Sequence, residues 1–137
     1  MVKVFSFDCD ETLEISRGPI PISDLRKLHD IGHIVGIVGN WGLVLQQVPD
    51  WHRFINFISL TINVTDLQGN VYGDKAWYLR EFKNYVRADA YYHIGNRFGA
   101  LNKLGVVCGS DDEGNCARAG YPWKFVKEDD WKLEDYI

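Results

Sequence analysis

The sequence is poor in cysteine and has no apolar run long enough to cross a bilayer. Its cysteines, Cys9, Cys108 and Cys116, are odd in number and lack the spacing of a zinc site, so they indicate free thiols in a reducing compartment. The first expected strand begins at Val2, so we expect no secretory leader. We therefore expect a cytoplasmic protein that does not associate with membranes.

The chain also lacks an excess of basic residues. Its net charge of −4 provides no general attraction for nucleic acid or for an anionic membrane. Apolar residues make up 46% of the 137 positions, which excludes a disordered chain and is enough for a buried core. We expect one domain spanning residues 1–137, without internal repeats.

The order of the apolar runs predicts an α/β protein. Short runs rich in β-branched and aromatic residues predict strands at residues 2–7, 34–38, 58–64, 90–95 and 106–108, with an edge strand at 123–126. Amphipathic stretches predict helices at residues 23–32, 41–57 in two pieces, 75–86, about 115–121, and after 128. This alternation is typical of a three-layer α/β/α sandwich with a mainly parallel, Rossmann-like sheet of about five strands.

The most informative stretch runs from Val2 to Leu13 and reads V-K-V-F-S-F-D-C-D-E-T-L. Asp8 and Asp10 follow the first apolar run directly, and Thr12 comes two residues later. The carboxyl ends of parallel strands border the crevice in which α/β proteins bind ligands. Two carboxylates so close together repel each other, so either a cation lies between them or one carries a proton. Mg²⁺ suits hard oxygen ligands of this kind.

This stretch resembles the first motif of the haloacid dehalogenase (HAD) superfamily, a hydrophobic strand followed by D-x-D-G-T-L. The resemblance implies that Asp8 is a nucleophile that forms an aspartyl phosphate, that Asp10 is the general acid and base, and that Mg²⁺ is the cofactor. Glu11 departs from the motif, which usually has glycine there. Larger relatives often insert a cap domain after this motif, and we expect none here because the chain is too short.

The resemblance extends to two later positions. The second motif, a Ser or Thr after the second strand, corresponds to Asn40, whose amide can donate a hydrogen bond to a phosphoryl oxygen. The alternative is that Asn40 only begins a turn before Gly42. The third motif corresponds to Lys75, which the resemblance pairs with Asp8 and the phosphate; the alternative is a solvated lysine. Thr12, Asn40 and Lys75 are thus the expected phosphate-binding residues.

Two alignments remain open for the metal-binding motif. Relatives end the fourth strand with Gly-Asp, whereas this chain has Gly95-Asn96, and a neutral amide oxygen binds Mg²⁺ less strongly than a carboxylate. In the first alignment, which we favour because of the strand order, Asn96 is the weakened ligand and Asp111 or Asp112 lies at a neighbouring strand edge. In the second, residues 106–108 form the motif strand and Asp111 or Asp112 is the ligand. A third interpretation of both aspartates is an acidic helix start.

We therefore expect a phosphomonoesterase that acts on a phosphorylated small molecule or a macromolecular phosphoester. The resemblance implies that Asp8, Asp10 and Lys75 are catalytic. It also implies that Mg²⁺ is held by Asp8, the Asp10 carbonyl, and Asn96 or Asp111/Asp112. An open site without a cap requires either a large substrate or a neighbouring subunit as a lid.

A second hypothesis is a HAD-fold protein that has lost turnover and serves as a binding or scaffolding module. Asn40 and Asn96, two departures within one site, motivate it. The intact pair of Asp8 and Asp10 opposes it, because a structural role does not require two adjacent carboxylates. The aromatic tail at 121–137 indicates docking on the domain or on a partner chain, so we expect that a homo-oligomer could form through it.

Overall fold

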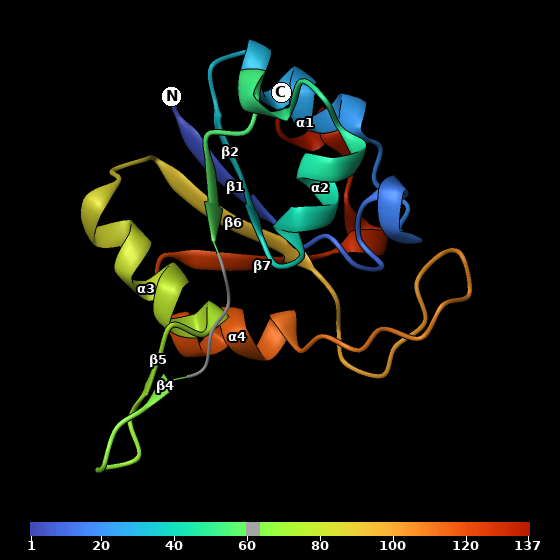
Figure 1. Cartoon of the computed structure of the whole chain (residues 1–137). Coiled ribbons are helices and arrows are strands. Elements are labelled where there is room, and N and C mark those ends of the chain that lie inside the picture. The colour runs from blue at the N-terminus through green and yellow to red at the C-terminus, as the bar shows by residue number, and fades with distance from the viewer. Residues whose placement is uncertain (60–63) are drawn as a thin grey trace.

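The protein is built around a parallel sheet, shown in the computed structural model of Figure 1, which describes residues 1–59 and 64–137. The described strands of this sheet, in spatial order, are β3 (Phe57–Ser59), β2 (Ile34–Val38), β1 (Lys3–Phe7), β6 (Ala90–Gly95) and β7 (Trp123–Lys127). Every neighbouring pair in this order is parallel. The predicted α/β class, with a parallel Rossmann-like sheet, is confirmed.

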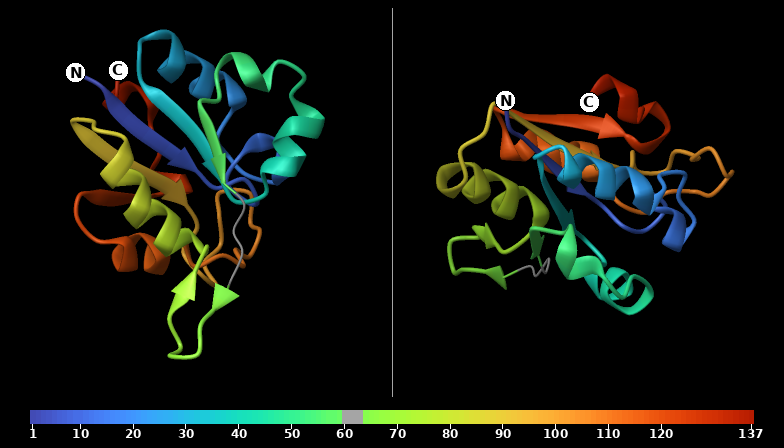
Figure 2. Two further views of the ribbon diagram at one scale, coloured as in Figure 1. Left: turned by 60° about the vertical axis from the view of Figure 1, so that its left-hand side comes forward. Right: turned by 90° about the horizontal axis from the view of Figure 1, so that it is seen from above.

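Helices cover both faces of the sheet, which makes a three-layer arrangement (Figure 2). The α-helices of the described residues are α1 (Ile22–Asp30), α2 (Trp41–Gln47), α3 (Lys75–Tyr85) and α4 (Asp112–Ala119). Short 3-10 turns are η1 (Glu14–Ser16), η2 (Trp51–Arg53), η3 (Glu128–Asp130) and η4 (Leu133–Asp135). No helix within the described ranges is long and apolar enough to span a membrane.

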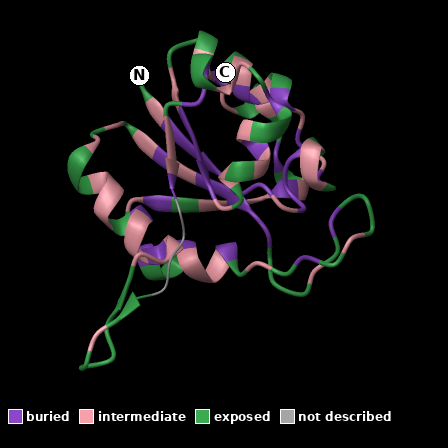
Figure 3. Ribbon diagram, in the orientation of Figure 1, coloured by how far each residue is buried: buried purple, intermediate pink, exposed green. Residues whose placement is uncertain are grey.

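The central strand β1 alternates its side chains between two hydrophobic clusters, as the period of a strand requires. Phe5 and Phe7 pack with residues of α1 and α2, whereas Val4 packs with residues of α3 and α4. Figure 3 shows β1 buried along most of its length. Since β1 is covered on both faces, its polar site residues begin beyond its end, at Asp8.

The aromatic tail packs on the protein's own sheet. Trp131 lies edge-on to Phe5 and Phe7, at ring-centroid distances of 5.8 and 5.3 Å, and stacks on Tyr136 at 4.8 Å. Its indole nitrogen donates a hydrogen bond of 2.9 Å to Asp24 in α1. These rings therefore complete the core of their own chain, and a homo-oligomer formed through the tail stays a prediction. The helix expected after Glu128 is instead the pair of 3-10 turns η3 and η4.

The strand predicted at 58–64 is shorter than expected. The sheet strand is β3, and residues 60–63 of the prediction lie outside the described part of the chain. Val64–Thr65 forms β4, which pairs antiparallel with β5 (Val71–Tyr72) in a hairpin that projects from the sheet (Figure 1). Both β4 residues are exposed, so the end of this apolar run contributes to the hairpin instead of the buried sheet.

The strand predicted at 106–108 is wrong. Val107 makes one isolated antiparallel bridge with Leu101, inside the long connection between β6 and α4. Both side chains are exposed, whereas Trp123 of β7 is buried and occupies the sheet position beside β6. A short β-branched run does not reveal from its pattern alone whether a sheet has room for it.

Candidate active site

Most of the site residues predicted from the sequence lie at the carboxyl edge of the sheet. Asp8 follows β1, Asn40 follows β2 and precedes α2, and Asn96 follows β6 (Figure 1). The backbone N–H of Asp8 donates to the carbonyl of Ile94 at 2.9 Å, which extends the pairing of β1 and β6 to the first catalytic candidate. Parallel pairing thus brings together residues that are 30 to 90 positions apart in the sequence.

Lys75 joins two buried carboxylates. Its Nζ donates hydrogen bonds to Asp8 Oδ1 at 2.9 Å and to Asp112 Oδ1 at 2.6 Å. Thr12 donates from its hydroxyl to the other oxygen of Asp8 at 3.3 Å. Lys75 can reach them because it opens α3, whose N-terminus is capped by Asp74 accepting from the Trp77 N–H at 2.8 Å. The lysine is therefore a member of the site and not a solvated surface charge.

Asp112 contacts His93, which in turn bonds to Ser6; the sequence patterns did not identify either residue as part of the site. His93 Nε2 lies 3.4 Å from Asp112 Oδ1, and Nδ1 lies 3.0 Å from the Ser6 hydroxyl. Burial lowers the pKa of His93, which favours a neutral ring that donates from Nε2 to Asp112 and accepts at Nδ1 from Ser6. The other Asp112 oxygen accepts from the Asn96 N–H at 2.8 Å. The signal available in the sequence was one polar residue within each of two otherwise apolar strands, Ser6 in β1 and His93 in β6.

The single charge of Lys75 is shared unequally between the two carboxylates. Burial raises the pKa of Asp8 to about 7, even though Lys75 acts in the opposite direction. Burial also acts on Asp112, but the hydrogen bond from His93 and the charge of Lys75 outweigh it and keep its pKa below the ordinary value. The pKa of Lys75 is held above its ordinary value by both carboxylates, against its own burial. Asp112 therefore carries the negative charge that balances Lys75, and Asp8 is the carboxyl group of the pair whose pKa is raised.

The raised pKa of Asp8 predicts that the contribution of this carboxyl to the stability of the metal-free protein falls as the pH rises from about 4 to about 7. The lowered pKa of His93 acts in the opposite direction below its ordinary value of 6.5, so the two contributions have to be separated. Between its ordinary pKa of 3.8 and its folded pKa of about 7, Asp8 binds more protons in the folded than in the unfolded state, so the free energy of unfolding falls with pH. Asp112 has the opposite sign, with stability lost only as the pH falls below its ordinary pKa of 3.8. Urea denaturation of the wild type and of Asp8→Asn, in EDTA at several pH values, isolates the contribution of Asp8. The wild type should lose stability relative to Asp8→Asn from pH 4 to pH 7, and a difference that grows in favour of the wild type over this range would contradict the assignment.

Asp10 and Glu11 shape the loop beyond β1. Asp10 Oδ1 accepts from the Ser16 hydroxyl at 2.6 Å and from the Asn40 amide at 3.3 Å. Glu11 has a φ of 57°, a left-handed backbone conformation that favours glycine. Its carbonyl accepts from the amide of Asn96 at 3.2 Å. The loop thus has a glycine-type conformation at the position where the sequence departs from the motif, and Asn40 bonds to Asp10 in addition to preceding α2.

Asn96 lies against a buried glutamate that the sequence analysis did not predict as a site residue. Its Nδ2 donates to Glu128 Oε2 at 3.1 Å, besides the Glu11 carbonyl, and contacts Cys108 Sγ at 3.3 Å. Its Oδ1 is buried and has no hydrogen-bond partner among the described residues. Glu128 is only 1% exposed and directly follows β7, so the rule that identified Asp8, a carboxylate after a sheet strand, also applies to it.

The two aspartates at 111–112 have different surroundings. Asp111 is exposed and caps α4 by accepting from the Gly114 N–H at 3.1 Å, as expected for an acidic helix start. Asp112 points into the buried cluster. The alignment that required residues 106–108 to be the motif strand loses its basis, because that segment is not in the sheet.

The fit of this site to Mg²⁺ rests on oxygen atoms from three residues. Within the described residues, no group of three or more His, Cys, Asp or Glu side chains is arranged to hold a metal ion. The expected donors are Asp8, the Asp10 carbonyl and Asn96, and the unpartnered buried Oδ1 of Asn96 is of the ligand type that Mg²⁺ accepts. The two oxygens of Asp112 accept three hydrogen bonds, from Lys75, His93 and the Asn96 N–H, which orient it within the cluster. Both Asp8 oxygens also accept, from Lys75 and Thr12, so Mg²⁺ would have to replace one of these bonds to bind Asp8.

Gly39 allows the chain to pass close to Asp8, and we expect Gly39→Ala to disturb the site. A Cβ at this residue would lie 2.6 Å from Asp8 Oδ1, and the φ of 151° is in the range that favours glycine. The substitution should lower the free energy of unfolding by about 1–3 kcal/mol and displace the Asp8 carboxylate. Gly42→Ala in α2 is the matched control, because its Cβ meets nothing closer than 4.0 Å and alanine favours a helix. Equal stability of the two variants in urea would contradict the prediction.

The chain was compared with protein-family models, curated proteins and solved structures. It matches no family model, no curated protein and no solved structure. The interpretation of the site therefore depends on its own chemistry and on the motif resemblance of residues 2–13.

Proposed function

We propose that the protein is a Mg²⁺-dependent phosphomonoester hydrolase of the HAD type that acts through an aspartyl phosphate on Asp8. The observation that supports it most is the cluster in which Lys75 bonds to both Asp8 and Asp112 beyond the central strand. A cation beside a nucleophilic carboxylate is the arrangement that phosphoryl transfer requires, because most of its catalysis comes from positioning and charge neutralisation.

The proposed reaction has two displacements at phosphorus. One oxygen of the Asp8 carboxylate attacks the phosphorus atom while the bond to the leaving oxygen breaks, and Asp10 gives that oxygen a proton. Asp10 then takes a proton from a water molecule that attacks the phosphorus atom of the aspartyl phosphate. The bond between phosphorus and the Asp8 oxygen breaks, which releases inorganic phosphate and restores the Asp8 carboxylate and the protonated Asp10. When bound by Asp8, the Asp10 carbonyl and Asn96, Mg²⁺ would neutralise phosphoryl charge and favour ionised Asp8.

The neighbouring residues have supporting roles in this proposal. Lys75 and Thr12, which contact Asp8 directly, would donate hydrogen bonds to the phosphoryl oxygens. Asn40 and Ser16, which donate to Asp10, would orient the general acid. His93 is a positioning residue, because it acts on Lys75 through Asp112.

The direct test is hydrolysis of p-nitrophenyl phosphate by the purified protein, with Mg²⁺ and with EDTA. Release of nitrophenol that depends on the metal would support the proposal. No turnover with any divalent cation, together with no calorimetric signal for Mg²⁺ binding at millimolar concentration, would reject it in favour of the scaffold.

The proposed setting is the cytoplasm, where the buried free thiols of the three cysteines would stay reduced.

The alternative is a HAD-fold binding or scaffolding protein without turnover. The observation that favours it is Asn96, which stands where a metal-binding carboxylate is expected and whose amide group bonds to protein acceptors. Substitution of Asn96 by aspartate is the natural discriminating experiment. This substitution would place a second carboxylate beside Glu128, because Asn96 Nδ2 now donates to Glu128 Oε2 at 3.1 Å.

We therefore expect Asn96→Asp alone to be destabilised in EDTA and the double variant Asn96→Asp/Glu128→Gln to be tolerated. Glutamine at 128 can donate to the new carboxylate, which removes the repulsion between two buried charges. If the site is an active one with a weakened metal shell, the double variant should bind Mg²⁺ at least about tenfold more tightly by calorimetry, because the ligand is then charged. Glu128→Gln alone is the control. Unchanged Mg²⁺ affinity in the double variant would support the scaffold.

A further inference from the structure

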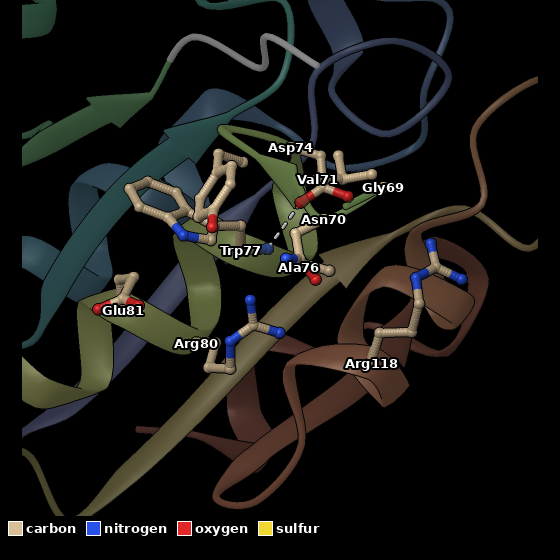
Figure 4. Close-up of a pocket in the computed structure, with 10 residues that line it drawn as sticks. Gly69, Asn70, Val71, Asp74, Ala76, Trp77, Arg80, Glu81 and Arg118 are labelled. Atoms are coloured by element: carbon tan, nitrogen blue, oxygen red, sulfur yellow. Dashed lines mark hydrogen bonds between the residues drawn. The ribbon is translucent and has the colours of Figure 1, made fainter. Parts of the chain in front are cut away.

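A pocket separate from the Asp8 cluster lies between the β4–β5 hairpin and helices α3 and α4 (Figure 4). Its volume is about 680 Å³, which is within the range of small-molecule sites in proteins. Its walls come from the hairpin, from one side of α3 and from Arg118 of α4. Asp8, Lys75 and Asp112 are not among its lining residues, so the proposed reaction does not account for it.

The hairpin wall is held in place by Asp66. Its carboxylate accepts from the backbone N–H groups of Gln68 and Asn70, both at 2.9 Å, and from the Tyr72 hydroxyl at 3.2 Å. Tyr72 lies beside Trp77 of α3, with ring centroids 6.5 Å apart and an interplanar angle of 72°. The pocket therefore has two aromatic rings on adjacent elements, one of them fixed at its hydroxyl. Such rings offer a surface on which a planar ring can pack.

The facing wall carries two arginines, with the acidic Glu81 beside them. Arg80 of α3 makes no hydrogen bond or ion pair with any residue that the structure describes. Arg118 donates to Asn115 at 2.7 Å and forms an exposed ion pair with Asp111 at 3.9 Å, a length that leaves its guanidinium able to bind a further anion. Figure 4 shows Arg80 lying between Glu81 and Arg118, with Arg118 on the neighbouring helix. The other acidic lining residue, Asp74, is occupied as the cap of α3. Guanidinium groups from two helices can bind one anion with charge-assisted hydrogen bonds.

From these two walls, we propose that the pocket binds a small organic anion that carries a planar ring, the chemistry of a nucleoside monophosphate. The ring packs against Tyr72 and Trp77, and the anionic group bonds to Arg80 and Arg118. An uncharged ring would lose the hydrogen bonds to the guanidinium groups, and a bare anion would lose the aromatic contact. This binding does not depend on the proposed hydrolysis at Asp8.

The test uses adenosine 5′-monophosphate as the probe and the Asp8→Asn variant as the protein, so that hydrolysis cannot consume the probe. Two-dimensional ¹H–¹⁵N NMR should show shifts at Tyr72, the Trp77 indole and Arg80. Adenosine alone and inorganic phosphate alone should bind more weakly. Arg80→Gln and Arg118→Gln should each weaken the binding by about tenfold or more, the effect of losing a charge-assisted hydrogen bond.

The matched control is Arg87→Gln, which removes an exposed arginine that does not line the pocket and should leave the affinity unchanged. Shifts confined to the neighbourhood of residues 8–12 would place the nucleotide in the candidate active site and overturn the proposal. The absence of pocket shifts at millimolar probe would overturn it as well. Both outcomes are distinct from a failure of the proposed phosphatase, which is measured separately on the wild-type protein with Mg²⁺.

Discussion

Asp8→Asn should reduce Mg²⁺-dependent hydrolysis of p-nitrophenyl phosphate by at least about a thousandfold, because an amide cannot attack phosphorus. The variant should nevertheless fold. Burial raises the pKa of Asp8 to about 7, so the native site already accommodates an uncharged group at this position near neutral pH. Asparagine has nearly the same shape, and its amide oxygen can accept the hydrogen bond from Lys75 that Asp8 accepts at 2.9 Å.

The control for this experiment is Asp111→Asn. Asp111 caps α4 from an exposed position, and asparagine is an equally good cap, so both turnover and stability should stay close to those of the wild type. An Asp8→Asn protein that keeps the wild-type rate would show that Asp8 is not the nucleophile. Trapping a phosphoryl group on the wild-type protein, by acid quenching and mass spectrometry of the peptide containing Asp8, would identify the intermediate directly.

Lys75→Met should lower the free energy of unfolding by about 3–5 kcal/mol at neutral pH, the effect of removing one partner from a buried ion pair. The remaining carboxylates, Asp8 and Asp112, are 3% and 0% exposed and would have no cation between them. The loss should shrink as the pH is lowered, because protonation of the carboxylates removes their charge. Urea denaturation at pH 7 and pH 5 measures both effects, and turnover should be lost as well.

Lys27→Met provides the control on the exposed side of α1, where the change should be less than about 0.5 kcal/mol. If Lys75→Met does not fold, the double variant Lys75→Met/Asp112→Asn keeps the prediction testable, because it removes a stranded charge together with its partner and should recover part of the stability. A Lys75→Met protein as stable as Lys27→Met would contradict the ion-pair cluster.

Local sequence patterns were sufficient for the elements that present the predicted catalytic residues. The strand at 90–95 is found where the apolar run predicts it, and the helix expected over 75–86 is α3, with Asp74 as its cap. That Asp8 and Lys75 meet could be expected from order along the chain and the resemblance to the HAD motifs.

The rest of the cluster depends on contacts that no local pattern encodes. Asp112 reaches Lys75 because the long connection after Asn96 leaves the sheet and returns to it at the start of α4. The sequence pattern did not predict this path, because residues 106–108 within the connection resemble a sheet strand. The contact of His93 with Asp112 joins residues 19 positions apart, and that of Glu128 with Asn96 joins residues 32 positions apart.

The sequence by itself determined the parallel α/β architecture and the carboxylates beyond its central strand, because the spacing of apolar residues is a local property of the chain. Only the tertiary structure decided which of Asp111 and Asp112 enters the cluster and which carboxyl group has the raised pKa. It also decided that β7, and not residues 106–108, completes the sheet. The physical reason is that burial and pairing of charges depend on distances across the fold, and these depend on how the long connections close.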